Sequence, residues 1–463
     1  MTAAHYDLVV LGAGPAGEKA AAQAAYWGRQ VAVVERAPAP GGAMVASAVS
    51  TKTIREAALY LTGFRRRDVY GVSLELSPEL ALERLRDRTA HVVATMTDAA
   101  AENLARHGID LIRGTASLAP DRTVVVDAGG PSPRTLTADV ILVATGSRPF
   151  HPPGVAFDDP DVLDSEAARA IDRQLASLVV VGGGAVGCEY ASIFTALGAE
   201  VTLVDSRPRL LPFMDAEISD LLAATFRSLG MRVEQDAGHP SVSRDADGLR
   251  VDLRSGEQLR PEKVVFATGR IGNTEELDLE AAGVTTDERG LIVVDEHYRT
   301  TAPGIYAAGD VIGPPALASV SMEQGRVAAC HAFDIHFKET VDPLPPFGVY
   351  SIPEVAKVGL GEEEAAAEGV DFAVGRGRFA GNTRAAITGS TDGMVKLVCE
   401  RGSGRLLGVH VLGEGATELV HVGQAVMALG GSVDYFIHAT FNAPTASEAY
   451  KYAAYDALAD LGR

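Results

Sequence analysis

Two glycine-rich turns of the same design, 170 residues apart, constrain this chain more than any other feature. The first, Gly12 to Gly17, follows the apolar run Leu8 to Leu11, and the second, Gly182 to Gly187, follows the run Leu178 to Val181. In each copy a further apolar run comes next and ends on an acidic residue. An ordinary α/β crossover can contain one such turn. Two copies in register predict an α/β fold with two Rossmann-like domains that hold two dinucleotides.

The residue types in these turns match the chemistry of a dinucleotide. The first glycine allows the tight turn, the second lets the backbone approach the pyrophosphate, and the third lets the helix pack against the strand. The pyrophosphate binds at the positive N-terminal end of the helix. The acid that closes each copy, Glu35 or Asp205, can accept both hydrogen bonds of a ribose diol.

Length and composition limit the classes of protein that the chain can be. Its 463 residues suggest about two to four domains. With 41 Lys and Arg against 61 Asp and Glu, the formal net charge is −20, which argues against a nucleic-acid or anionic-membrane partner. No apolar stretch is long enough to span a bilayer, and the first predicted strand starts too early for a secretory signal peptide. Three scattered cysteines provide neither a disulfide framework nor a metal site, so we expect a cytoplasmic protein without a metal.

Glycine and proline clusters suggest where the domains end. Each nucleotide block closes on Ala-Thr-Gly, the segment 147–154 has the composition of a linker, and a proline-rich boundary lies at 342–346. We therefore predict three domains. Their boundaries are 1–150 with 271–342 for the first nucleotide domain, 151–270 for the second, and 343–463 for a C-terminal α+β domain.

Together these motifs resemble those of the two-dinucleotide-binding flavoprotein disulfide reductases. The resemblance covers essentially the whole chain and is closest to the soluble pyridine nucleotide transhydrogenases. The stretches that carry it are Thr53 to Leu61, Gly187 to Ser192, His421 to Ala425 and Thr440 to Thr445. It implies FAD on the first turn and a nicotinamide dinucleotide on the second. It also implies a homodimer through the C-terminal domain, which lends its last segment to the partner's active site.

The resemblance assigns binding residues to both cofactors. It places Glu35 at the adenosine ribose of FAD and Asp310 at the ribityl chain. The FAD set is Gly12, Gly14, Pro15, Ala16, Gly17, Glu35, Arg36, Gly42, Lys52, Ala144, Thr145, Gly146, Gly309, Asp310 and Ala318. The nicotinamide-nucleotide set is Gly182, Gly184, Val186, Gly187, Glu189, Asp205, Arg207 and Gly269.

The residues after the second acid bear on the choice of nucleotide. Asp205 favours NAD(H), because a carboxylate repels a 2′-phosphate. Arg207 and Arg209 could pair with such a phosphate or simply lie on the surface, so NADP(H) stays open.

The chain departs from the family at its redox centre. The family has Gly-Gly-x-Cys, a second cysteine after four more residues, and then Pro-Ser-Lys. Here the segment from Gly41 to Lys52 is one residue shorter and contains no cysteine. Met44 stands at the first cysteine position and cannot supply a thiolate, and the position of the C-terminal histidine holds Ala443. We therefore expect no disulfide reduction by the family's thiol mechanism.

Four residues remain as catalytic candidates. Lys52 and Glu189 match an ion pair that lies beside the isoalloxazine in the family, where a cation would stabilise negative charge on reduced flavin. The alternative is a surface lysine and an ordinary helix carboxylate. Asn442 could offer hydrogen bonds in place of the missing histidine, and Glu448 is retained from the family's C-terminal motif.

Small residues near the missing thiols suggest two possibilities. Ala48 and Ala443, together with Met44, either line an apolar pocket for a second substrate or form a packed wall.

These observations predict an FAD-dependent NAD(P)H oxidoreductase. In the leading hypothesis, hydride passes through FAD to a small-molecule acceptor, which is another nicotinamide nucleotide. In the alternative, the acceptor is a quinone, a dye-like compound, oxygen or a specialised small metabolite. A third hypothesis is a flavin- or nucleotide-binding protein that has lost its chemistry, and the retained Lys52, Glu189 and Asp310 argue against it.

Overall fold

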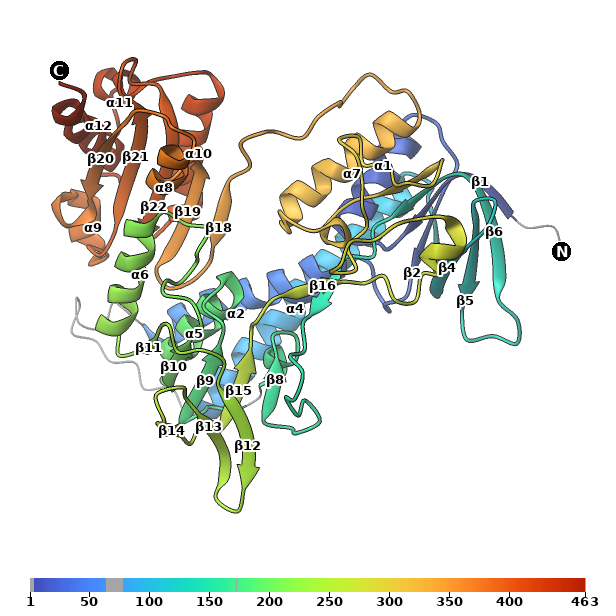
Figure 1. Cartoon of the computed structure of the whole chain (residues 1–463), viewed down its shortest axis with the longest axis horizontal. Helices are drawn as coiled ribbons and strands as arrows, with labels where there is room; N and C mark the ends of the chain where they lie inside the picture. The colour runs from blue at the N-terminus through green and yellow to red at the C-terminus, as the bar shows by residue number, and fades with distance from the viewer. Residues whose placement is uncertain (1–3, 64–77, 172, 463) are drawn as a thin grey trace. The chain divides into compact units, whose positions relative to one another are not determined.

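The computed structural model describes residues 4–63, 78–171 and 173–462 (Figure 1). The chain forms two compact units, each assembled from three segments. The first unit contains Met1–Ser50, Asp87–Phe150 and Arg270–Pro343, and the second contains Thr51–Arg86, His151–Gly269 and Leu344–Arg463. Among the described residues, no helix combines the length and the apolar character needed to cross a membrane.

A seven-stranded sheet forms the centre of the first unit. Its strand order is β3-β2-β1-β6-β5-β4, with β17 also paired to β6. The strands are β1 (Ala4–Leu11), β2 (Val31–Glu35), β3 (Asp110–Arg113), β4 (Thr115–Ala119), β5 (Thr123–Asp127), β6 (Arg134–Val143) and β17 (Ile305–Ala307). The pairs β1–β2, β1–β6, β2–β3 and β6–β17 are parallel, and β4, β5 and β6 form an antiparallel ribbon. Residues 8–11 are all buried, as expected for a parallel strand covered on both faces.

Two helices, α1 and α7, pack against this sheet and against each other. Figure 1 shows α1 and α7 side by side, and they pack so closely that a Cβ on Gly325 would overlap the backbone of Ala16. The helical segments of this unit are α1 (Pro15–Tyr26), η1 (Met44–Val49), η3 (Leu279–Ala282), η4 (Asp310–Ile312) and α7 (Ala318–Ala332). From Thr51 on, α2 (Ser50–Thr62) belongs to the second unit, and α4 (Pro78–Arg106) passes from the second unit into the first after Arg86.

The second unit repeats the nucleotide-binding architecture. Its parallel sheet has the order β11-β10-β9-β15-β8, and a small antiparallel sheet, β12-β13-β14, follows α6 and β11 in the chain. The strands are β8 (Val162–Asp164), β9 (Ser177–Val181), β10 (Glu200–Val204), β11 (Arg232–Glu234), β12 (Ser241–Asp245), β13 (Gly248–Asp252), β14 (Gln258–Leu259) and β15 (Lys263–Phe266). The helical segments are η2 (Ala167–Ala170), α5 (Ala185–Ala196) and α6 (Ala216–Ser228).

The rest of the second unit is built on an antiparallel sheet of order β18-β19-β22-β21-β20, drawn in orange and red in Figure 1. The strands are β18 (Phe347–Val349), β19 (Glu354–Gly359), β20 (Phe372–Arg378), β21 (Met394–Glu400) and β22 (Leu406–Gly413). The helical segments are α8 (Glu362–Ala367), η5 (Phe379–Gly381), α9 (Thr383–Thr388), α10 (Ala416–Ala428), α11 (Val433–His438) and α12 (Glu448–Leu461). Helices α10 and α12 pack on one face of this sheet, where Val395, Leu397 and Val409 join their core.

The α/β fold class is confirmed, and one local expectation needs correction. The predicted linker contains a short strand, β7 (Ser147–Pro149), which pairs antiparallel with β16 (Arg270–Gly272). The chain leaves the first unit directly after β7 and returns to it at the start of β16. The segment Met44–Val49, where the family has its cysteines, is a π-helix that leads directly into α2. The division into three domains stays a prediction.

Candidate active site

The two glycine-rich turns have the same backbone geometry. Gly12 and Gly182 begin the turns with φ angles of 104° and 112°, which residues with a Cβ rarely adopt. A Cβ on Gly17 or Gly187 would overlap the carbonyl oxygen of Gly12 or Gly182. Because glycine has no Cβ, each helix approaches its strand more closely than it could with any other residue at this position.

The N-termini of the two helices are open to an anion. Gly14 and Gly184 precede α1 and α5, and neither helix has a side chain bound to its first amides. A Cβ on Gly184 would meet no heavy atom within 4 Å, and one on Gly14 would meet only the Cα of Gly42, at 3.9 Å. The N–H groups are thus free to bind a pyrophosphate, so both turns fit a dinucleotide.

In the first unit, a chain of hydrogen bonds holds the proposed flavin-binding carboxylate. The Ser147 hydroxyl donates to Asp310 Oδ2 at 2.7 Å, and Arg270 Nε donates to Ser147 Oγ at 2.8 Å. The Gly309 N–H donates to Gln324 Oε1 at 2.9 Å. We did not identify these partners, Ser147, Arg270 and Gln324, from the sequence. Ser147 and Arg270 each follow one of the two Ala-Thr-Gly motifs.

The remaining predicted FAD residues also belong to the first unit, apart from Lys52. Glu35 is buried, and its carboxylate accepts the N–H groups of Ala13 and Ala37, each at 2.7 Å. Arg36 is exposed and pairs with Glu276 at 3.3 Å. The others occupy the first turn of α1 (Pro15, Ala16), the loop directly after β6 (Ala144, Thr145, Gly146) and the start of α7 (Ala318).

In the second unit, the acid after β10 already has partners. Asp205 is buried and accepts the N–H of Gly183, and Arg207 Nε and Nη2 donate to its two oxygens at 2.9 and 2.6 Å. Val186 lies in the first turn of α5, and Gly269 follows β15. The Arg207 side chain is 44% exposed, so it presents its guanidinium to solvent while neutralising the acid.

Lys52 and Glu189 form the predicted ion pair. Lys52 Nζ lies 2.9 and 2.8 Å from the two oxygens of Glu189, which is buried in α5. The backbone N–H of Tyr350 donates to Glu189 Oε1 at 3.0 Å, and the Tyr350 ring centroid lies 4.9 Å from Lys52 Nζ. The lysine is thus fixed by a carboxylate and an aromatic face, and Tyr350 was not identified from the sequence.

The other candidate residues are divided between the two units. Met44 and Ala48 are half-buried in the first unit, whereas Asn442 and Ala443 are exposed in the second. The carboxylate of Glu448, at the start of α12, accepts the N–H of Thr445 at 3.2 Å. The pocket lined by Met44, Ala48 and Ala443 stays a hypothesis.

The three cysteines lie in the interior of the protein. Cys188, Cys330 and Cys399 are buried, and none of them forms a disulfide. Burial raises the pKa of the Cys188 thiol, and the charges of Asp205 and Glu189 add to this effect. Burial raises the pKa of Cys330 as well. These thiols are therefore protonated and shielded, unlike reactive cysteines.

Comparison with known proteins places the chain in a family. Residues 6–325 match the family described as pyridine nucleotide-disulphide oxidoreductase, and residues 345–454 match its dimerisation domain. The chain is 43% identical over 456 residues to a soluble pyridine nucleotide transhydrogenase of Mycobacterium tuberculosis, with 98% of this chain and 97% of the relative covered. The identity to a protein of the same name from a Marinomonas species is 38%, with 98% of each chain covered.

Solved structures agree. The crystal structure of LpdA from Mycobacterium tuberculosis superposes with a TM-score of 0.87 at 30% identity, covering 98% of this chain and 99% of that one. The HOCl-induced flavoprotein disulfide reductase of Escherichia coli gives 0.87 at 27% identity, covering 97% and 99%. The family implies FAD and a nicotinamide nucleotide as cofactors, and the dimerisation domain indicates a homodimer. The chain is a member of the pyridine nucleotide-disulphide oxidoreductase family.

Proposed function

We propose that this chain is an FAD-dependent enzyme that oxidises a reduced nicotinamide nucleotide and delivers the hydride to a second one, without a redox disulfide. The segment from Gly41 to Lys52 carries the proposal, because it has Met44 where the family has its first thiol. The cysteines elsewhere are buried and form no disulfide. Direct hydride transfer between stacked rings needs no protein acid or base, so loss of the thiols and of the histidine leaves this reaction possible.

The roles of the retained residues follow from their contacts. When bound, FAD supplies the two-electron chemistry. Asp310, oriented by Ser147 and Arg270, would hold the ribityl chain. Lys52, fixed by Glu189 and Tyr350, would stabilise the negative charge of the reduced cofactor.

We further propose that the second site prefers NAD(H) but also binds NADP(H). A carboxylate at the position of Asp205 can accept the hydrogen bonds of a ribose diol, which supports NAD(H). Its charge is neutralised by Arg207, whose exposed guanidinium could pair with a 2′-phosphate. An enzyme that moves hydride between the two nucleotide pools needs this tolerance. The cytoplasm is the proposed location, since buried cysteines that form no disulfide suit a reducing compartment.

Anaerobic mixing tests the proposal. The purified holoenzyme is reduced with NADH or NADPH while flavin absorbance is followed, and it is then mixed with a thio-nicotinamide dinucleotide or with a quinone. Bleaching by either donor, followed by fast reoxidation with the thio-nicotinamide, is the expected result. Slow reoxidation there and fast reoxidation by the quinone would assign a different acceptor. Absence of bleaching with both donors would show that the chemistry has been lost.

A further inference from the structure

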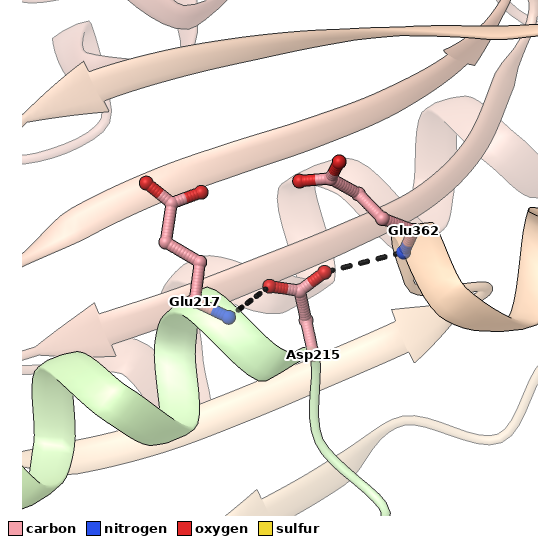
Figure 2. A group of neighbouring side chains, drawn as sticks. All are labelled: Asp215, Glu217 and Glu362. Atoms are coloured by element: carbon pink, nitrogen blue, oxygen red, sulfur yellow. Dashed lines mark hydrogen bonds between the residues drawn. The ribbon is translucent and has the colours of Figure 1, made fainter.

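A buried lysine joins the two halves of the second unit. Lys396, in β21, is 1% exposed, and its Nζ lies 2.6 Å from Asp215 Oδ1, 3.0 Å from Glu217 Oε2 and 2.5 Å from Glu362 Oε1. Figure 2 shows that these carboxylates come from two elements, Asp215 and Glu217 from the start of α6 and Glu362 from the start of α8. The three acids have the arrangement of a cation site, and the cation that they surround is the lysine ammonium.

Asp215 is the junction of this cluster. Its Oδ1 accepts the N–H groups of Glu217 and Ile218, at 3.0 and 3.4 Å, and so caps the N-terminus of α6. Its Oδ2 accepts the N–H of Glu362 at 3.2 Å, as drawn in Figure 2. One carboxylate therefore fixes the first residues of both helices, and Lys396 neutralises it.

The lysine belongs to a row of basic residues that crosses the antiparallel sheet. Arg376, Lys396, His410 and Lys357 are direct cross-strand neighbours on β20, β21, β22 and β19, so they share one face. Arg376 Nε donates to Glu217 at 2.8 Å, and Lys357 pairs at 3.1 Å with a glutamate of α8. Of the three cations that form ion pairs here, Lys396 alone is fully buried.

The loop that ends at Asp215 begins at the nucleotide-binding acid, Asp205. We call residues 205–215 the nucleotide loop. Its Leu211 N–H donates to the carbonyl of Gly183 at 2.8 Å, and a Cβ on Gly183 would come within 2.5 Å of the Leu210 side chain. The loop is thus held at its middle by the second glycine-rich turn and at its end by the Lys396 cluster.

We propose that Lys396 is a positioning residue for the nicotinamide-nucleotide site. By holding Asp215, it fixes the end of the nucleotide loop, and the loop in turn sets Gly183 and the Asp205–Arg207 pair. Without the ammonium, three carboxylates whose oxygens lie within 4.8 Å of one another would repel, and the start of α6 would move. The inference rests on the proposed function only in taking the second turn as the nucleotide site.

The test compares Lys396→Met with Lys357→Met in the holoenzyme. The control removes a lysine from the same row that pairs with α8 and not with α6. For Lys396→Met we expect faster hydrogen exchange in residues 205–215 and a dissociation constant for NAD⁺ raised by about tenfold, with flavin reduction at saturating NADH changed less than about twofold. The control should change none of these quantities.

Asp215→Asn provides a second route if Lys396→Met fails to fold, because asparagine can still cap the helix. It should shift the same quantities in the same direction by a smaller factor. Wild-type values in a folded Lys396→Met protein, or a lower melting temperature alone, would overturn the inference. If the wild-type enzyme does not bind NAD⁺, the proposed function fails, and the exchange rates still decide whether Lys396 fixes the loop.

Discussion

Arg207 donates hydrogen bonds to both oxygens of the Asp205 carboxylate, at 2.9 and 2.6 Å. Burial opposes ionisation of Asp205, but the hydrogen bonds and charge of Arg207 outweigh it and hold the pKa of the acid below its usual range. The hydrogen bonds that Arg207 donates to Asp205 in turn raise the pKa of Arg207. The pair therefore stays charged at every physiological pH, and a nucleotide meets an acid that already has a basic partner.

This pair predicts how the nucleotide preference changes on mutation. Arg207→Ala removes the group that would meet a 2′-phosphate and exposes the acid's charge to it. The KM for NADPH should rise by about tenfold or more, and that for NADH by less. Steady-state kinetics with both donors measure the difference. Arg232→Ala is the control, since Arg232 has similar exposure, 41% against 44%, and pairs with glutamates elsewhere. Equal losses for both nucleotides would contradict the assignment.

Lys52→Met should slow flavin reduction. The substitution keeps most of the side-chain volume and removes the charge proposed to stabilise the reduced cofactor. Stopped-flow measurement under anaerobic conditions should show a rate lower by about a hundredfold. Lys338→Met is matched to it, because Lys338 is also paired with a glutamate and is 30% exposed against 31% for Lys52. An unchanged rate for Lys52→Met would remove Lys52 from the catalytic set.

Ser147→Ala should weaken FAD binding. Asp310 would lose one hydrogen bond, and Arg270 would lose the hydroxyl oxygen that receives its Nε–H. We expect the dissociation constant for FAD to rise by about tenfold, measured by fluorescence of released flavin during dilution. Ser243→Ala, an exposed change in β12, should leave it unaffected. Equal retention of FAD in both variants would show that the hydrogen bonds joining Arg270, Ser147 and Asp310 do not support FAD binding.

The cysteines should resist thiol reagents. Because burial raises the pKa of Cys188 and of Cys330, ionisation of both thiols moves to more alkaline pH, and little thiolate forms near about pH 7 to 8. Titration with a disulfide reagent should label no thiol in the folded enzyme and all three after denaturation. Rapid labelling of a folded thiol, accompanied by loss of activity, would show that a cysteine takes part in the reaction.

The glycine-rich turns could be predicted from the sequence because their backbone geometry requires glycine. The turns at Gly12 and Gly182 were identified because a positive φ and a close helix–strand approach exclude other residues, which leaves a visible pattern. Lys52 and Glu189 were paired through the family resemblance, and the structure agrees.

Contacts between distant residues left no such pattern. Asp215 and Lys396 lie 181 residues apart, and the only sign of their bond was a lysine inside the apolar strand Met394–Glu400. The sequence also left open whether Arg207 is a surface residue or a phosphate ligand. It did not predict that Arg207 donates a hydrogen bond to Asp205.

A reductive titration tests whether hydride passes between the two nucleotides without a disulfide relay, as we propose. Dithionite is added anaerobically to the FAD-loaded enzyme, and the flavin absorbance is followed against electrons added. We expect complete reduction after about one two-electron equivalent per FAD, because the proposed mechanism uses no redox group besides the flavin. An enzyme with a redox-active disulfide takes up about two equivalents per FAD. A second equivalent consumed before full reduction would contradict the account.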